Sequence, residues 1–116
     1  MDTKATSNTM YTAEKIRDIT VQKLDADKAE EIHVIDLEGK TDIARYMIIA
    51  SGLSMRHVKS LADNLSQELK SHTSDGFNIE GLNTGKWVLI DIKDVIVHIF
   101  QPETRLQYDI DKLWDN

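Results

Sequence analysis

The residues best suited to chemistry are Gly52, Leu53 and Ser54, which stand between a predicted strand and a predicted helix. A Gly-Ser segment in that position can hold a nucleotide phosphate on the free N–H groups of the helix. Nucleotidyl transfer also needs a pair of acidic residues that share metal ions. The strands predicted after this helix carry no Asp-x-Asp pair, and Asp91 and Asp94 flank a predicted hairpin turn, where aspartate is common. The sequence therefore predicts no catalytic residue, and a nucleotidyltransferase-like enzyme stays the alternative.

Other kinds of reactive site find less support in residue type and spacing. The chain has no cysteine, which excludes a disulfide, a thiolate metal site and a cysteine nucleophile. The four histidines do not have the spacing of metal ligands, and no Ser-His-acid set can be assigned from sequence alone. These histidines are His33, His57, His72 and His98. We therefore expect no metal and no cofactor, and we expect the protein to act by binding.

Composition limits the class of protein and the kind of partner. A chain of 116 residues with 41% hydrophobic and 29% charged residues can fold as one compact domain. A net charge of −6 disfavours direct binding to nucleic acid and suits a basic protein partner. No apolar run approaches the ~20 residues of a membrane span, and the first residues lack the apolar region of a signal peptide. These features indicate a cytoplasmic protein without a membrane segment.

Hydrophobic periodicity predicts a single α/β domain over residues 11–116, preceded by a disordered tail over 1–10. The strand over 46–50 has no polar alternation, so we expect it at the sheet centre with both faces covered. The order of strand, helix and strand predicts a parallel pairing. The sheet is expected to be mixed and to have about five strands. The predicted elements are a helix over about 12–25, strands over 31–37 and 46–50, a helix from 54 to about 72–74, a short stretch over 77–80, and strands over 86–92 and 95–100.

The last segment, 103–116, carries apolar residues at helix-like spacing, and Pro102 ends the strand before it. Leu106, Ile110 and Leu113 recur every three or four residues. We therefore expect this segment to pack back on the body of the domain.

The last two predicted strands form an antiparallel hairpin if Lys93 and Asp94 make a two-residue turn. Strand alternation then gives the hairpin one purely aliphatic face, which belongs to the core. The other face is a mixture of aromatic, apolar and polar residues, which is typical of the centre of a protein interface. A helix covering this face, with Trp87 as an ordinary core residue, stays an equal alternative. The mixed face contains Trp87, Leu89, Asp91, Ile96, His98 and Phe100.

Several separated motifs, in order along the chain, resemble the iojap family of ribosomal silencing factors. The resemblance covers the chain from about residue 13 to residue 114 and is specific because the motifs agree together. They are YMIIASGLSMRHV at 46–58, EG at 80–81, WVLID at 87–91, DVIVHIFQPE at 94–103, RLQY at 105–108 and LW at 113–114.

The resemblance implies a mixed α/β domain with a nucleotidyltransferase-like layout and a non-enzymatic role. The implied partner is ribosomal protein fourteen of the large subunit, at the face where the two subunits meet. A factor bound there obstructs the small subunit and lowers translation when nutrients are short. We predict that the partner-binding residues are Trp87, Leu89, Asp91, His98, Phe100, Glu103, Arg105 and Tyr108.

Three positions depart from the usual pattern of that family. Arg45 replaces a residue that is commonly acidic, which could alter charge pairing with the partner. Met55 replaces a small polar residue, and Lys93 replaces a glycine in the hairpin turn, where a positive φ is disfavoured for lysine. A homodimer that uses the same hairpin face is the remaining alternative to ribosome binding.

Overall fold

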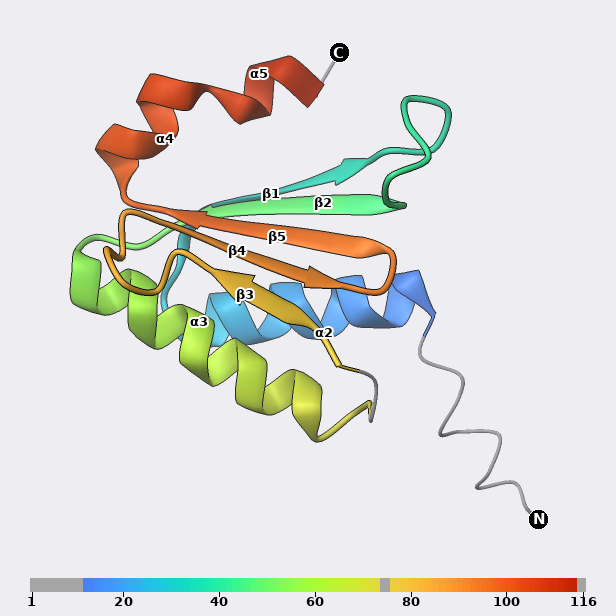
Figure 1. The fold of residues 1–116 in the computed structure, drawn as a ribbon, viewed down its shortest axis with the longest axis horizontal. Coiled ribbons are helices and arrows are strands. Elements are labelled where there is room, and N and C mark those ends of the chain that lie inside the picture. The colour runs from blue at the N-terminus through green and yellow to red at the C-terminus, as the bar shows by residue number, and fades with distance from the viewer. Residues whose placement is uncertain (1–11, 74–75, 115–116) are drawn as a thin grey trace.

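The computed structural model describes residues 12–73 and 76–114, so the tail predicted over 1–10 lies outside the described residues. The described residues form one α/β domain with a five-stranded sheet, as predicted (Figure 1). No helix of the described ranges is long and apolar enough to cross a membrane. The elements in chain order are α2 (Ala13–Ala26), β1 (Glu30–Asp36), β2 (Tyr46–Ser51), α3 (Met55–Lys70), β3 (Asn78–Glu80), β4 (Trp87–Ile92), β5 (Val95–Phe100), α4 (Pro102–Tyr108) and α5 (Ile110–Trp114).

The strands lie in the order β1-β2-β5-β4-β3, and the sheet is mixed. The predicted parallel pairing exists between β2 and β5, whereas the other three pairs are antiparallel. All six residues of β2 are buried, as the unbroken apolar run predicts. The central position itself belongs to β5, because the chain crosses through α3 and forms β3 and β4 at the far edge first.

The hairpin of β4 and β5 has the predicted register, with Ile92 opposite Val95 across the turn. Lys93 takes the positive φ of 51° that the turn requires, although its Cβ makes this conformation unfavourable. The two-residue turn is therefore kept without glycine. Its register places Trp87 opposite Phe100 and leaves the two side-chain faces as the sequence predicts.

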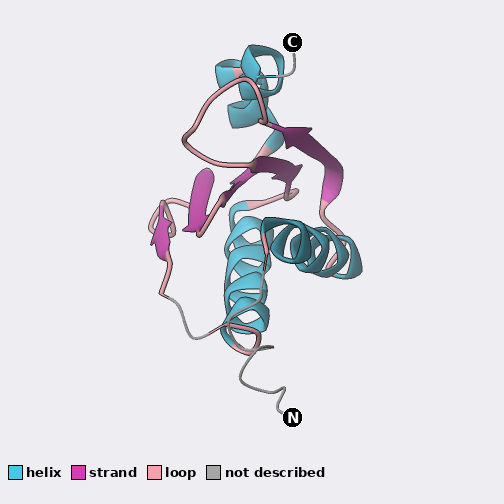
Figure 2. Cartoon of the chain, turned by 90° about the vertical axis from the view of Figure 1, so that its right-hand side faces the viewer, coloured by secondary structure: helices cyan, strands magenta, loops and turns pink. Residues whose placement is uncertain are grey.

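One face of the sheet is covered by α2 and α3, which lie side by side beneath it in Figure 1 and form a separate layer in Figure 2. The aliphatic face of the hairpin packs here. Ser54 caps α3 by accepting a hydrogen bond from the backbone N–H of His57 at 3.0 Å, as its position predicts. The buried residues that α3 contributes are Val58, Leu61, Ala62, Leu65, Ser66 and Leu69.

The opposite face carries the short helices α4 and α5, which lie above the sheet in Figure 1. The predicted packing of this last segment is only partly right. Ile110 and Trp114 contact an apolar cluster on this face, but Leu106 and Leu113 are 81% and 70% exposed. The buried members of this cluster are Ile35, Leu37, Ala44, Met47, Ile49 and Phe100. The helix-like spacing fails because the chain turns at Asp109, whose φ is +50°, and splits the segment into two helices.

Candidate functional site

The Gly52-Leu53-Ser54 segment is explained by the fold. A Cβ on Gly52 would lie 2.9 Å from Val58 Cγ2 and 3.1 Å from Leu61 Cδ1, so the glycine lets α3 approach the end of β2. Ser54 is the helix cap described above. Gly52 and Ser54 therefore each have a structural role without a phosphate.

Four aromatic rings gather on the face of the hairpin that α2 and α3 do not cover. The centroid of the Trp87 ring lies 4.9 Å from the centroid of Phe100 and 4.9 Å from that of Tyr108. The His98 ring lies 5.8 Å from both Trp87 and Phe100. Trp87 is thus at the middle of the group, between the hairpin and α4. Offset contacts of this kind add to the stability given by burial.

A hydrogen bond fixes the orientation of the Trp87 indole. Its Nε1–H donates to His98 Nδ1 at 2.9 Å, so the histidine must be neutral and carry its proton on Nε2. Burial lowers the pKa of His98 from 6.5 to about 4, against an opposing influence of Asp111. Both observations indicate a neutral histidine at physiological pH that acts as a support for Trp87.

The predicted partner-binding residues differ in their access to solvent. Tyr108 is 53% exposed, and Trp87 and Leu89 are half-buried. Asp91 and Glu103 are exposed. His98 and Phe100, in contrast, are buried beneath the rings of Trp87 and its neighbours. The alternative of a covering helix is therefore partly right, because the short C-terminal helices cover one part of this face, and the rest of the face stays accessible to a partner.

Two hollows flank the Trp87 ring. One, of about 560 Å³, lies between the loop before β4 and α4, and its lining includes Lys86, Glu103 and Tyr108. The other, of about 270 Å³, is lined by Glu80, Gly81, Trp87 and Leu89. Sequence reasoning missed Glu80, which stands directly opposite Leu89 in the pairing of β3 with β4. A three-residue edge strand gives too short a pattern to reveal that pairing.

The exposed and half-buried residues of this region are together called the Trp87 surface. Its apolar centre is Trp87, Leu89 and Tyr108. Its carboxylates are Glu80, Asp91 and Glu103, all exposed. Within residues 12–73 and 76–114, none of these three carboxylates forms an ion pair.

The loop between β3 and β4 needs glycine at two positions to shape the Trp87 surface. Gly81 has a φ of +92°, and a Cβ there would overlap the carbonyl oxygen of Trp87. Gly85 has a φ of +69°, and a Cβ there would overlap Met55 Cγ. The unusual Met55 thus packs against this loop and helps to hold it on α3. Gln101 Nε2 donates to the Gly85 carbonyl at 2.9 Å from the other side.

Arg105 forms a set of contacts within the chain. Its guanidinium donates two hydrogen bonds to Asp111, at 3.1 and 2.7 Å, and a third to Ser51 Oγ at 2.9 Å. The Arg105 side chain is only 13% exposed. Three of its five N–H donors are thus used within the chain, and its predicted contact with a partner stays a prediction.

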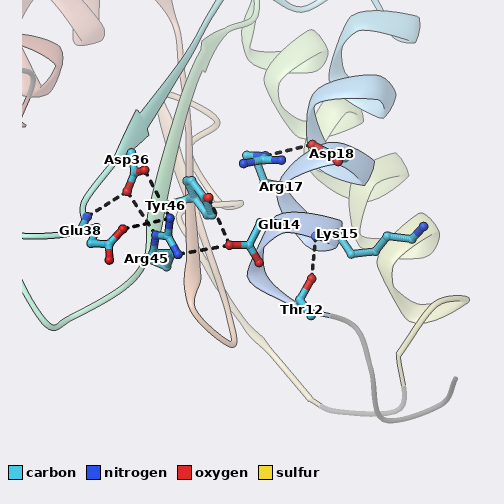
Figure 3. A network of polar contacts seen from close by, with 9 residues as sticks. All are labelled: Thr12, Glu14, Lys15, Arg17, Asp18, Asp36, Glu38, Arg45 and Tyr46. Carbon is cyan, nitrogen blue, oxygen red and sulfur yellow. Dashed lines mark hydrogen bonds and ion pairs between the residues drawn. The ribbon is translucent and has the colours of Figure 1, made fainter. Parts of the chain in front are cut away.

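Arg45, the first departure from the family pattern, also has its partners within the chain (Figure 3). Its guanidinium contacts Glu14 at 3.1 Å, Asp36 at 3.2 Å and Glu38 at 3.2 Å, and it lies 4.8 Å from the centroid of Tyr46. Its hydrogen bond to Asp36 lowers the pKa of that carboxyl group. The cluster lies at the other end of β2 from the Arg105 contact with Ser51. Arg45 therefore joins the start of α2 to the β1–β2 connection.

In residues 12–73 and 76–114, the acidic and histidine side chains do not assemble into a metal site. No group of three or more potential ligands comes together in the part of the chain that the structure describes. An Asp-x-Asp pair does occur at Asp109 and Asp111, in the corner between α4 and α5. Asp111 is bound by Arg105 and contacts His33 Nδ1 at 3.1 Å, whereas Asp109 ends α4. The pair therefore has structural roles.

Comparison with known proteins identifies relatives along almost the whole chain. A ribosomal silencing factor of Zymomonas mobilis is 41% identical over 108 residues, which are 93% of this chain and 81% of that protein. The mouse protein named mitochondrial assembly of ribosomal large subunit protein 1 is 31% identical over 84% of this chain and 44% of its own length. A crystal structure of a Chromobacterium violaceum protein matches with a TM-score of 0.85 and 36% identity, over 89% of this chain and 86% of that one.

The family model described as "Ribosomal silencing factor during starvation" matches residues 10–116. That range includes the hairpin, the loop before it and both C-terminal helices, which are the elements that build the Trp87 surface. Sequence, fold and matched range agree. The chain therefore belongs to the family of ribosomal silencing factors.

Proposed function

We propose that this protein docks on the large ribosomal subunit through ribosomal protein fourteen and blocks joining of the small subunit. The block is steric, so no bond is made or broken, and translation falls under nutrient limitation. Membership of the silencing-factor family supports a role at the ribosome. The name of the mouse relative, which refers to the large subunit, supports the choice of subunit.

The Trp87 surface is the observation that carries this proposal. Its apolar centre is rigid, because Trp87 is held by His98 and by two neighbouring rings. Large aromatic residues at the centre of an interface contribute most of its binding energy. The three carboxylates around them, unpaired among the described residues, add a negative rim. A basic protein surface complements that rim, and opposite potentials speed encounter.

The first experiment measures sedimentation of the protein with purified large and small subunits, and then its affinity for isolated protein fourteen. We expect binding to large subunits only. Trp87→Ala should weaken it by about 30-fold or more, which is about 2 kcal/mol. Equal retention on both subunits, or unchanged affinity of the Trp87 variant, would contradict the proposal.

A charge-reversal pair tests the negative rim. Asp91→Lys with Glu103→Lys should weaken binding, because it places cations against a basic partner. The matched control is Asp25→Lys with Asp63→Lys, which changes the net charge equally at exposed positions on α2 and α3. Equal losses in the two double variants would mean that overall charge, rather than the Trp87 surface, governs binding.

The proposed block is tested by mixing the two subunits and following their association by light scattering. The parent protein should reduce joining, and the Trp87→Ala variant should do so only at proportionally higher concentration. Self-association of the protein through the same surface is separated from this by analytical ultracentrifugation. A dimer that dissociates in the Trp87→Ala variant, without any effect on subunit joining, would favour the homodimer instead.

A further inference from the structure

The helices that place Tyr108 on the Trp87 surface are too short to hold their position alone. α4 has seven residues and α5 has five, and neither contains a buried residue. Isolated helices of this length are unstable in water. Their place on the sheet must therefore come from specific contacts. The apolar part of these contacts comes from the partly buried Ile110 and Trp114 and from the ring of Tyr108 against Trp87.

A polar clamp supplies the rest. Arg105 in α4 and Asp111 in α5 form a two-bond pair across the corner between the helices. Such paired bonds between guanidinium and carboxylate fix geometry as well as distance. The hydrogen bond from Arg105 lowers the pKa of Asp111 to about 2, so the carboxylate stays charged. The side chains are only 13% and 25% exposed, which limits screening by solvent.

The clamp also ties the corner to the sheet. Arg105 Nη1 donates to the Oγ of Ser51, the last residue of β2, and Asp111 Oδ2 contacts His33 of β1. Lys40 Nζ donates to the carbonyl of Trp114 at 2.8 Å and holds the far end of α5. The corner is thus attached to β1 and β2 by side-chain contacts.

Tyr108 lies between the two members of the clamp in sequence, one helical turn after Arg105. Beyond it, Asp109 adopts the left-handed conformation that turns the chain toward Asp111. The ring of Tyr108 contacts Trp87 at 4.9 Å between centroids and is otherwise half exposed. Its position against Trp87 therefore depends on the corner that the clamp closes.

We propose that Arg105 and Asp111 are positioning residues for docking: they hold Tyr108 against Trp87 and so set the affinity of the Trp87 surface without touching the partner. The proposal rests on the proposed function for the identity of the partner. It gives Arg105 a role different from the direct contact that its place in the family motif suggested. Loss of the clamp leaves the apolar centre with Trp87 and Leu89 alone and with a mobile Tyr108.

The test uses Trp87 as its own reporter. The chain has two tryptophans, so a Trp114→Phe background leaves Trp87 as the single one. In that background Asp111→Asn should increase acrylamide quenching of Trp87 fluorescence and weaken large-subunit binding by about 10-fold. The matched control is Asp109→Asn, the same chemical change two residues away, because asparagine accepts the left-handed conformation. It should leave both readouts unchanged.

A double-mutant cycle connects the clamp with Tyr108. If the clamp acts through Tyr108, the loss of binding in Asp111→Asn combined with Tyr108→Ala should be much smaller than the sum of the two single losses. Additive losses, or unchanged quenching of Trp87 in Asp111→Asn, would overturn the positioning role. Ser51→Ala removes one bond of Arg105 without a change of charge and should shift both readouts in the same direction by less. It serves as the test if Asp111→Asn does not fold.

The quenching measurement needs no ribosome, so it separates the two proposals. Increased quenching in Asp111→Asn, together with a parent protein that does not bind large subunits, would reject the proposed function and keep the clamp as a support for Tyr108. The positioning role alone would be rejected by another result. In that result the parent binds large subunits normally, and the clamp variants change neither the quenching of Trp87 nor the affinity.

Discussion

The two faces of the sheet are covered in different ways, although they share the same five strands. On one face, α2 and α3 have 14 and 16 residues and bury nine side chains between them. On the other, α4 and α5 have seven and five residues and bury none. Figure 2 shows the long helices and the short ones on opposite sides of the strands. The difference separates a face closed by long helices from a face that has a smaller buried cluster and stays partly accessible.

The hairpin shows this difference within single strands. Ile90 and Leu89 are neighbours in β4, but their side chains point to opposite faces. Ile90 is fully buried under the long helices, whereas Leu89 is half-buried beside the 270 Å³ hollow. A binding surface can be built on strands this rigid because the core on their other side holds them in place.

The largest expected effect on stability comes from the face under α2 and α3. Ile90→Ala should lower the free energy of unfolding by about 2–5 kcal/mol, because it leaves a cavity in a closed core. Leu89→Ala, its neighbour on the other face, should cost clearly less stability and should weaken large-subunit binding instead. Urea unfolding and subunit sedimentation of both variants check this. Similar losses of unfolding free energy in the two variants would show that both faces of the hairpin contribute equally to stability.

A pH dependence is the next effect in size, and it arises at His98 on the other face. Its pKa is about 4 in the folded protein and ordinarily 6.5, so the unfolded chain takes up a proton first as the pH falls. Stability attributable to this group is therefore complete above pH 6.5 and is lost between 6.5 and 4, by an amount on the order of 3 kcal/mol.

His98→Gln should flatten this part of the stability curve, because glutamine does not titrate and its carbonyl can still accept the Trp87 N–H. The measurement is urea unfolding at several pH values between 4 and 7. A parent slope that survives in His98→Gln would place the responsible proton elsewhere.

Much of the fold could be predicted where a short-range pattern decides the structure. The register of the hairpin follows from a two-residue turn and a period of two, and it was confirmed at every pair from Trp87 to Ile92. Ser54 and the apolar spacing after it were enough to place α3. In these elements, local preference and burial act in the same direction.

The position of α4 and α5 on the sheet could not be predicted in the same way, because it depends on polar contacts between residues far apart in the sequence. Arg105 bonds to Ser51, 54 positions away, and Asp111 to His33, 78 positions away. Apolar spacing predicted that this segment packs on the body of the domain, and Ile110 does so, but Leu106 and Leu113 are exposed. It was also impossible to foresee that His98 and Phe100 lie under Trp87, since alternation along a strand gives the face of a residue but not what covers it.

The smallest expected effect concerns Leu106, which sharpens the contrast between the two covers. Leu106 lies on α4 and, like Leu65 on α3, belongs to a row of apolar residues three or four positions apart. Leu106 is 81% exposed, whereas Leu65 is fully buried. Leu106→Ala should therefore change the free energy of unfolding by no more than about 0.5 kcal/mol, since a substitution at an exposed position removes little packing. Leu65→Ala should cost about 2–5 kcal/mol in the same urea titration. Because alanine also favours a helix, α4 should persist in the Leu106 variant, and binding to the large subunit should stay within the error of the parent value. A loss of 2 kcal/mol or more at Leu106 would mean that α4 packs as tightly as α3, and the contrast between a stabilising face and a binding face would then fail.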